Sequence, residues 1–427
     1  MPAHAVSRST AESTLISQFE GRRELARSHE RAAAFRRFAD RGLPTRRVES
    51  WHYTDLRAAM ADAAPLAPAP DRAQIESAAR ELGRRKKLGA ARLVLLNGRF
   101  VDQLSDGLPA GAAVVRRGGK TLAVDDPMVA LAEAMSLDGC AVEVSGGAEL
   151  DGPVEFLHLV SGEGPLSVYS RMEIIVGAGA RASFIETFAG SGASVQRHAL
   201  TTLTLAEGAT LKHAAIVDSQ AELHLESQVI EIGAGAELKA FALVSGGTLS
   251  RRQLFVRMVG EKAKAALGGL ALLDGERRAD TTLQLVHSAP GGTSREFYRA
   301  IVDDEAAGTF QGKVIVANGA QKTDGAMKSQ AVLLSPRAQM NAKPELEIFA
   351  DDVVCGHGAT VGSLDPEQIF YLRTRGVRKD EAEAMLLEAF GGEAIERIGD
   401  DALAGVLHEA FRAWLASRGK GPMEARR

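Results

Sequence analysis

The phrase Gly177-Ala178-Gly179-Ala180 returns as Gly233-Ala234-Gly235-Ala236, and shorter versions of it recur through the middle of the chain. Short runs with strand-like patterns lie between the copies, for example Leu223–Ile232 and Lys313–Val316. The middle copies are roughly 27 to 32 residues apart, a spacing typical of a solenoid built from stacked repeats. Small residues suit the corners of such coils because bulky side chains would clash there. Further copies lie at 146–148, 207–209, 261–263, 306–308, 335–338 and 356–359.

The repeats predict a β-helix or β-roll over residues 114–364. Each coil would contribute short strands that stack on the next coil, and no coil could bury its inner face alone, so the stack would be cooperative. The 44 glycines and the low aromatic content of 5% agree with many short strands joined by tight turns. A large β-sandwich is the alternative, but its turns would be spaced less regularly.

Residues 1–113 form an N-terminal region with a helical and mixed pattern. The segment Glu12–Arg41 carries apolar residues among charges and alanines, which predicts amphipathic helix. Farther along, Arg92–Leu96 has the pattern of a short strand and is followed by the turn signal Asn97-Gly98.

Residues 365–427 are predicted to form a helical C-terminal domain. Asp380–Phe390 is helical in pattern, and Gly391-Gly392 is expected to end that helix. Apolar residues at 403–415 recur at helical spacing, and the polar tail from Ser417 onward is expected to fray. The predicted fold class is therefore mainly β with flanking helices.

The composition, with 45% hydrophobic and 25% charged residues, is that of a globular protein. A formal net charge of −4 over 427 residues gives no support for nucleic acid or an anionic membrane as the main partner. No run approaches the roughly 18 apolar residues of a membrane helix, and no targeting segment is visible at Met1–Gln18. Two cysteines, Cys140 and Cys355, fit a reducing compartment. We therefore expect a cytoplasmic protein.

Cys355 and His357 form the sharpest local feature that could carry chemistry. In an extended strand, residues two apart point to one face, with Cα atoms roughly 6.5 Å apart. A thiolate and an imidazole are good ligands for zinc, iron or copper, and they could also form a nucleophile pair. The alternative is that Cys355 is a small buried hydrophobic residue. Two ligands are too few for a closed metal site, so the others would come from elsewhere in the chain or from another subunit.

Other candidate sites are weaker. Asp303-Asp304 and Asp351-Asp352 are paired carboxylates, but acids in solvated turns are the simpler interpretation. Gly308–Lys313 resembles a phosphate loop, yet its spacing is wrong and Val314 follows instead of Ser or Thr, so no nucleotide site is predicted. Five further residues show no ligand spacing and are expected to be structural: Cys140, His198, His213, His224 and His287.

Six segments of the chain form a recognisable set when they are taken together and in order. They are Glu49-Ser50-Trp51-His52-Tyr53-Thr54-Asp55-Leu56, Asn318-Gly319-Ala320-Gln321-Lys322-Thr323-Asp324-Gly325, Ser329-Gln330, Asn341-Ala342-Lys343-Pro344-Glu345-Leu346-Glu347-Ile348, Asp352-Val353-Val354-Cys355-Gly356-His357-Gly358-Ala359-Thr360-Val361-Gly362 and Phe370-Tyr371-Leu372-Arg373-Thr374-Arg375-Gly376. This set resembles the SufB/SufD family of iron–sulfur cluster assembly subunits. The resemblance covers most of the chain and is weakest between about residues 60 and 170. It implies a right-handed parallel β-helix core with a helical C-terminal domain.

Two departures favour the SufD branch over the SufB branch of this family. SufB chains follow the Ser-Gln phrase with a cysteine that serves cluster assembly, whereas Ala331 follows Ser329-Gln330 here. SufB chains also carry His-Glu where this chain has Gly356-His357-Gly358. Because the principal thiolate is missing, the chain is not expected to be a self-sufficient cluster scaffold.

The resemblance implies a non-catalytic subunit of a complex. The chain would pair through its β-helix with SufB, and its C-terminal helices, residues 365–427, would dock the ATPase SufC. Energy for rearrangement would come from SufC, because this chain has no phosphate loop. A cysteine desulfurase would act indirectly as sulfur donor. A homodimer is the expected alternative when the chain is isolated, because solenoid edges can pair.

By the same resemblance, His357 and Cys355 would face SufB and help to bind iron or a nascent iron–sulfur cluster. SufB would add its own cysteine and acidic residues, so the site would be composite. The isolated chain is expected to bind no cofactor tightly, and a flavin of the full complex has no assigned residues here.

Two other function classes also use a solenoid. A polysaccharide-active enzyme would need aromatic and acidic residues along one face, which the aromatic content of 5% opposes. A purely structural solenoid would not need the helical C-terminal region or the Cys-x-His pair.

Overall fold

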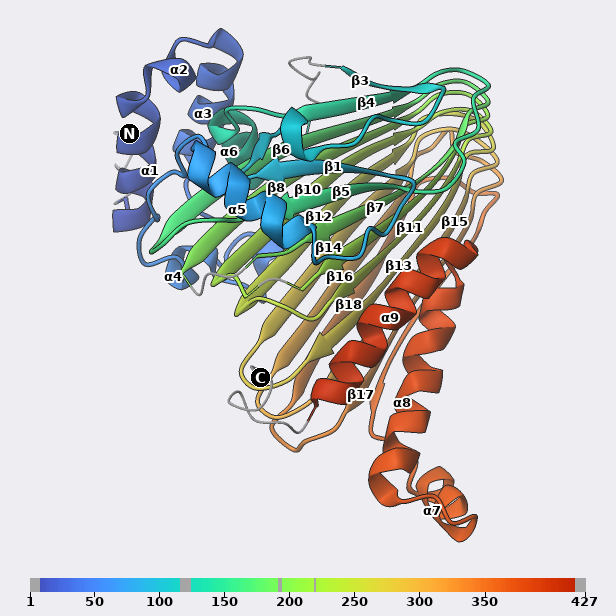
Figure 1. Cartoon of the computed structure of the whole chain (residues 1–427). Helices are drawn as coiled ribbons and strands as arrows, with labels where there is room; N and C mark the ends of the chain where they lie inside the picture. Colours follow the sequence, from blue (N-terminus) through green and yellow to red (C-terminus); the bar gives the residue numbers. More distant parts are fainter. Residues whose placement is uncertain (1–7, 116–123, 191–193, 219, 419–427) are drawn as a thin grey trace, which may run out of the picture.

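The computed structural model describes residues 8–115, 124–190, 194–218 and 220–418. These residues form a solenoid of two facing sheets, with helices on the outer faces (Figure 1). The ten-stranded sheet contains, in order, β2 (Arg99–Phe100), β1 (Ala91–Leu96), β5 (Val154–Leu159), β7 (Arg181–Phe188), β9 (Thr210–Val217), β11 (Glu237–Val244), β13 (Lys264–Leu273), β15 (Thr293–Val302), β17 (Asp324–Leu333) and β19 (Val354–Gly362). The nine-stranded sheet contains β3 (Ala112–Val115), β4 (Cys140–Val144), β6 (Leu166–Val176), β8 (Val195–Leu205), β10 (Leu223–Ile232), β12 (Leu249–Met258), β14 (Arg278–His287), β16 (Ala307–Val316) and β18 (Gln339–Ile348).

Strands that follow each other in the sequence alternate between the two sheets from β4 onward. Except at the first end, neighbouring strands within a sheet are parallel: β10 pairs with β8 on one side and with β12 on the other, so that Leu223 lies opposite Gln196 and Leu249. A β-sandwich would be antiparallel, so the structure confirms the parallel β-helix and excludes the alternative. The right-handed sense and the domain limits at 113 and 364 stay predictions.

The recurrent Gly- and Ala-rich phrases form the corners of the coils. Gly179, Gly208 and Gly235 occupy equivalent corners with φ of 66°, 67° and 61°, a left-handed conformation that glycine adopts without steric penalty. Each corner also bonds to the next, since the Gly179 and Gly208 amides donate to the carbonyls of Glu207 and Ala234 at 2.8 Å. The repeat that is visible in the sequence is therefore the period of the coil.

The two ends of the solenoid differ. At the first end, the Asn97-Gly98 turn makes β1 and β2 an antiparallel hairpin, and the short strand β3 is antiparallel to β4. At the last end, β18 and β19 each pair on one side only. We call this end, β18 and β19, the open end. Phe349, which follows β18, and Val354, the first residue of β19, are exposed although they are apolar.

The helices within residues 10–59 and the helix at 127–135 cover the outer face of the nine-stranded sheet, whereas the helix at 72–82 packs on β1 and β5 of the ten-stranded sheet (Figure 1). The predicted helical stretch Glu12–Arg41 is interrupted, because Arg22 is extended and Ser28 caps a new helix by accepting from the Arg31 amide. Leu223 and Leu249 on the sheet pack against these helices. The elements before the C-terminal region are α1 (Thr10–Gly21), α2 (Arg23–Ala26), α3 (His29–Arg41), η1 (Glu49–Trp51), α4 (Leu56–Ala59), α5 (Arg72–Leu82), η2 (Asp102–Leu104) and α6 (Pro127–Met135).

Residues 49–56, here named the clasp, lie across the outer face of the nine-stranded sheet. Trp51 is fully buried, and the Arg251 guanidinium of β12 stacks 3.7 Å from its ring centroid. Arg251 is also ion-paired with Asp280 of β14, whose carboxylate accepts from the Thr54 hydroxyl at 2.5 Å. A buried ion pair needs such additional hydrogen bonds to offset its desolvation. The clasp is therefore fixed to the sheet by buried contacts.

The clasp continues toward the open end. The Ser50 carbonyl accepts from Arg251 of β12 at 2.6 Å and from Gln311 of β16 at 3.2 Å. Glu49 then lies 3.4 Å from Lys343 on the edge strand β18. One short segment thus contacts every strand of this sheet from β12 to β18.

Helices α7 (Pro366–Thr374), α8 (Lys379–Glu396) and α9 (Asp401–Ser417) follow the solenoid, and α8 and α9 pack on the outer face of the ten-stranded sheet (Figure 1). The expected break at Gly391-Gly392 is wrong, because α8 runs through both glycines. A side chain at 391 would lie 2.4 Å from the ring of Phe411, so glycine is needed for the close approach of α9. Residues 419–427, most of the tail that was expected to fray, lie outside the described residues.

Charged side chains lie inside the solenoid. Glu186 accepts from His158 at 2.8 Å and from the Thr201 hydroxyl at 3.0 Å, and His213 lies 3.3 Å from its other oxygen. Burial alone would raise the pKa of Glu186, but the two histidines lower it to about 2. The sequence analysis missed this group, because it needs the register of three strands. None of the helices in the described ranges is both long and apolar enough to span a bilayer.

Candidate functional site

Cys355 and His357 lie on β19, the last strand of the ten-stranded sheet. Cys355 pairs with Gly325 of β17, and His357 pairs with Met327. Met327 belongs to the apolar cluster inside the solenoid, and Cys355 packs against the same cluster. Since residues two apart share a face, both Cys355 and His357 lie on the inward side of the last coil.

The Cys355 thiol has space beside it. A methyl group at Gly325 would lie 3.4 Å from the Cys355 sulfur and 3.5 Å from the Ser294 hydroxyl, so glycine leaves that volume empty. Burial raises the pKa of the Cys355 thiol above its usual range. The thiolate is the metal ligand, so metal binding here would have to release a proton.

His357 is exposed at the open end. In the described ranges, no group of three or more His, Cys, Asp or Glu side chains is arranged to hold a metal ion. The structure therefore brings the two predicted ligands onto one face but supplies no third. A closed site of about four ligands would need donors from outside these residues.

The other residues singled out in the sequence lie apart from this pair. Ala331 is buried inside the solenoid, three inward positions along β17 from Gly325. Asp303 pairs with Arg418 at 2.8 Å, and Asp304 occupies a left-handed turn, which agrees with turn acids. The remaining candidates are buried side chains: Cys140, His198, His213, His224 and His287.

Glu296 is a residue that sequence reasoning missed. It shares an inward row with Met327 and His357, two strands in from the edge. Neither of its buried carboxyl oxygens has a hydrogen bond of good geometry among the residues described, and the nearby Ser294 hydroxyl offsets only part of the effect of burial. Burial raises the pKa of Glu296 to about 7, so this carboxyl group holds its proton far more readily than an exposed glutamate does. Because side chains alternate between the two faces of a strand, Glu296 could have been assigned to the inward face once the register of its strand was known.

The family model for the SufBD core domain of SUF-system FeS cluster assembly matches residues 158–390, which is most of the solenoid and the start of the C-terminal helices. The chain belongs to the SufB/SufD family. This confirms the predicted family, and the matched residues include the strand with Cys355 and His357.

Relatives of this SufB/SufD chain cover most of its length. It is 30% identical over 380 residues to the iron–sulfur cluster assembly protein SufD of Escherichia coli, spanning 85% of this chain and 87% of the relative. It is 28% identical to a SufBD family protein of Synechocystis, with 86% of each chain covered. Protein ABCI7 of Arabidopsis thaliana chloroplasts is 29% identical over 61% of this chain and 57% of its own. The first of these names agrees with the SufD branch that Ala331 favours.

Proposed function

We propose that this chain acts in iron–sulfur cluster assembly as a non-catalytic subunit that docks its open end against a SufB subunit. The observation that carries the proposal is the incomplete ligand pair on β19. Cys355 and His357 share an inward face at an unpaired strand edge, and the chain's described residues add no third ligand. A docking subunit that supplies the missing donors would complete the site.

The open end has the character of a docking surface. An edge strand presents a row of free backbone N–H and C=O groups that another chain can pair with. Ile348, Phe349 and Val354 are exposed apolar side chains at this edge, and exposed apolar patches mark interaction surfaces. A second copy of this chain could pair there when SufB is absent.

The C-terminal helices carry a second part of the proposal, in which they dock the ATPase SufC. Phe370 and Tyr371 on α7 are more than half exposed, and Met385 on α8 is also exposed. Amphipathic or apolar helix surfaces of this kind fit grooves on partner proteins. Motion of SufC could reach the solenoid through α8, because Arg299 of β15 binds the Phe390 carbonyl and Glu393.

The test is co-expression of the tagged chain with SufB and SufC, followed by measurement of iron and acid-labile sulfide in the purified complex. His357→Ala is expected to leave the complex assembled and to lower its iron content about tenfold or more. Thr360→Ala, on the outward side of the same strand, is the matched control and is expected to load normally. Normal iron content in His357→Ala would refute the role of His357. Failure of the wild-type chain to recover SufB would refute the docking proposal.

A further inference from the structure

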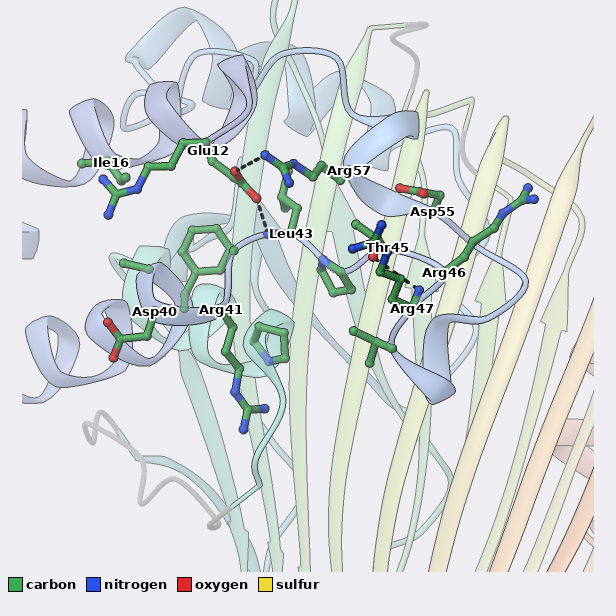
Figure 2. A pocket seen from close by; sticks show the side chains of 17 residues that line it. Glu12, Ile16, Asp40, Arg41, Leu43, Thr45, Arg46, Arg47, Asp55 and Arg57 are labelled. Atoms are coloured by element: carbon green, nitrogen blue, oxygen red, sulfur yellow. Dashed lines mark hydrogen bonds and ion pairs between the residues drawn. The ribbon is translucent and has the colours of Figure 1, made fainter. Parts of the chain in front are cut away.

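The loop between Pro44 and η1 carries two arginines, Arg46 and Arg47, that the proposed cluster site does not use. Both are exposed, and neither has a carboxylate partner in the described part of the chain. Together with Arg8, Arg41 and Arg57 they line a hollow of about 1260 Å³, which we call the basic hollow (Figure 2).

Among the residues described, three carboxylates line the basic hollow, and two of them are engaged by other groups. Glu12 accepts from the Leu43 amide at 2.8 Å and lies 3.4 Å from Arg57 (Figure 2). Asp55 caps α4 by accepting from the Ala58 amide at 2.9 Å. The third is Asp40, and Arg41 is ion-paired with Asp125. Within the described ranges none of these carboxylates is ion-paired with Arg46 or Arg47, so both arginines keep their positive charge available.

The clasp fixes the position of this charge. Only Val48 separates the arginine pair from residues 49–56, which are anchored by the buried Trp51 and by the contact of Thr54 with Asp280. Binding groups on a rigid base lose less entropy when a partner binds. The backbone that carries Arg46 and Arg47 is thus held in place by the clasp, although the two arginine side chains are exposed.

The arginine pair also lies close to the open end. Glu49, two or three residues farther along the chain, contacts Lys343 on the edge strand β18. Because one residue spans at most about 3.6 Å, the backbone of Arg46 and Arg47 lies within roughly 11 Å of the Glu49 backbone. A subunit that docks on the open end and extends past Glu49 would therefore meet Arg46 and Arg47, which line the basic hollow.

We propose that Arg46 and Arg47 bind an acidic segment of the subunit that docks on the open end. This deepens the proposed function and rests on it. Such an interface would have an apolar centre at Phe349 and Val354 and a charged flank, as protein interfaces commonly do. Arginine clusters are a recurrent means of recognising acidic segments.

Three alternative occupants fit less well. Residues 1–7 contain no Asp or Glu, and residues 419–427 contain one Glu against three basic residues, so neither terminus supplies complementary charge. A compact phosphate would need donors that converge on one point. Figure 2 instead shows the side chains of Arg41, Arg46 and Arg57 pointing in different directions, which favours an extended chain with several carboxylates.

The experiment compares the double variant Arg46→Glu/Arg47→Glu with the matched control Arg23→Glu/Arg27→Glu. Both change two exposed arginines, and both change the net charge of the chain from −4 to −8. Affinity for the purified SufB subunit is measured by calorimetry at low and high salt. We expect the hollow variant to bind about tenfold more weakly at low salt, with a smaller difference at high salt, and the control to bind within about twofold of wild type.

Each other outcome overturns the inference in a distinct way. If the wild-type chain does not bind the SufB subunit, the docking proposal itself fails. If the wild type binds and the hollow variant binds equally well, the docking stands and the inference about the arginines fails. Equal weakening of both variants would show a long-range charge effect only. Inorganic pyrophosphate that binds wild type but not the hollow variant, with docking unchanged, would reassign the hollow to a small anion.

Discussion

Two buried glutamates inside the same solenoid have pKa values that are shifted in opposite directions. Glu186 lies between His158 and His213, which lower its pKa to about 2 despite burial. Neither oxygen of Glu296 has a hydrogen bond of good geometry in the described residues, and burial raises its pKa to about 7. The difference comes from neighbouring residues on other strands, since both glutamates face inward on the ten-stranded sheet.

Stability should therefore depend on pH through Glu296. Its folded-state pKa is raised above the unfolded value of 4.5, so the folded chain is favoured below pH 4.5 and loses that advantage as pH rises through about 7. Glu296→Gln removes the ionisation, and at pH 8 it is expected to raise the unfolding free energy by up to about 3 kcal/mol. At pH 4 it should change little. Denaturant unfolding at both pH values measures this.

The matched control is Glu276→Gln, at an exposed position in a turn. In this control, the difference in unfolding free energy between pH 4 and pH 8 should be the same as in wild type. Equal effects of Glu296→Gln at both pH values would contradict the assignment of a buried carboxyl group without a hydrogen bond of good geometry.

The sequence allows the positions of some of these side chains to be predicted but not those of others, and the reason is physical. Cys355 and His357 share a face because alternation along one strand requires it, and one strand is visible in one sequence segment. Glu296 and Glu186 depend on which strands stack beside them. The register pairs residues on successive coils that are 26 or more residues apart in the sequence. A short sequence segment therefore does not reveal it.

At the scale of secondary-structure elements, the corners of the coils could be predicted from the local sequence, whereas the packing of the C-terminal helices could not. The corners were predictable because left-handed glycines at Gly179 and Gly235 have a local steric cause. Gly391 was misjudged as a helix break, since a glycine in a helix also permits close packing against another helix. Its neighbour Phe411 lies 20 residues farther along the chain, and no local rule identifies it.

Gly391 and Gly405 provide a matched pair in this helical region. Gly391→Ala is expected to lower the unfolding free energy by about 1 to 3 kcal/mol, because its methyl group would overlap the Phe411 ring. Gly405 lies on α9 with open space around it, so Gly405→Ala should raise stability by up to about 1 kcal/mol through helix propensity. Chemical denaturation of both variants gives the comparison. A stabilised Gly391→Ala would contradict the close packing of α8 and α9.

On the scale of the whole molecule, the open end and α7 are two separate exposed apolar surfaces. Phe349 at the open end is 63% exposed and Phe370 on α7 is 69% exposed. If each surface serves one partner, Phe349→Glu should weaken docking of SufB and spare SufC, while Phe370→Glu should do the reverse. Quantitative co-purification with each partner measures both. Loss of both partners in either variant, or a lowered melting temperature, would count against two independent surfaces.

The unequal ends of the solenoid also limit how far such molecules can assemble. Indefinite growth requires that each added subunit present a fresh edge equivalent to the one it covered. Here the long edges, β18 and β19, are at one end, and the opposite end has only the antiparallel strands β2 and β3, of two and four residues. Two solenoids that meet through their long edges leave no third long edge exposed. Stacking through these long edges would therefore end after a single junction, which gives a pair of solenoids and not a filament.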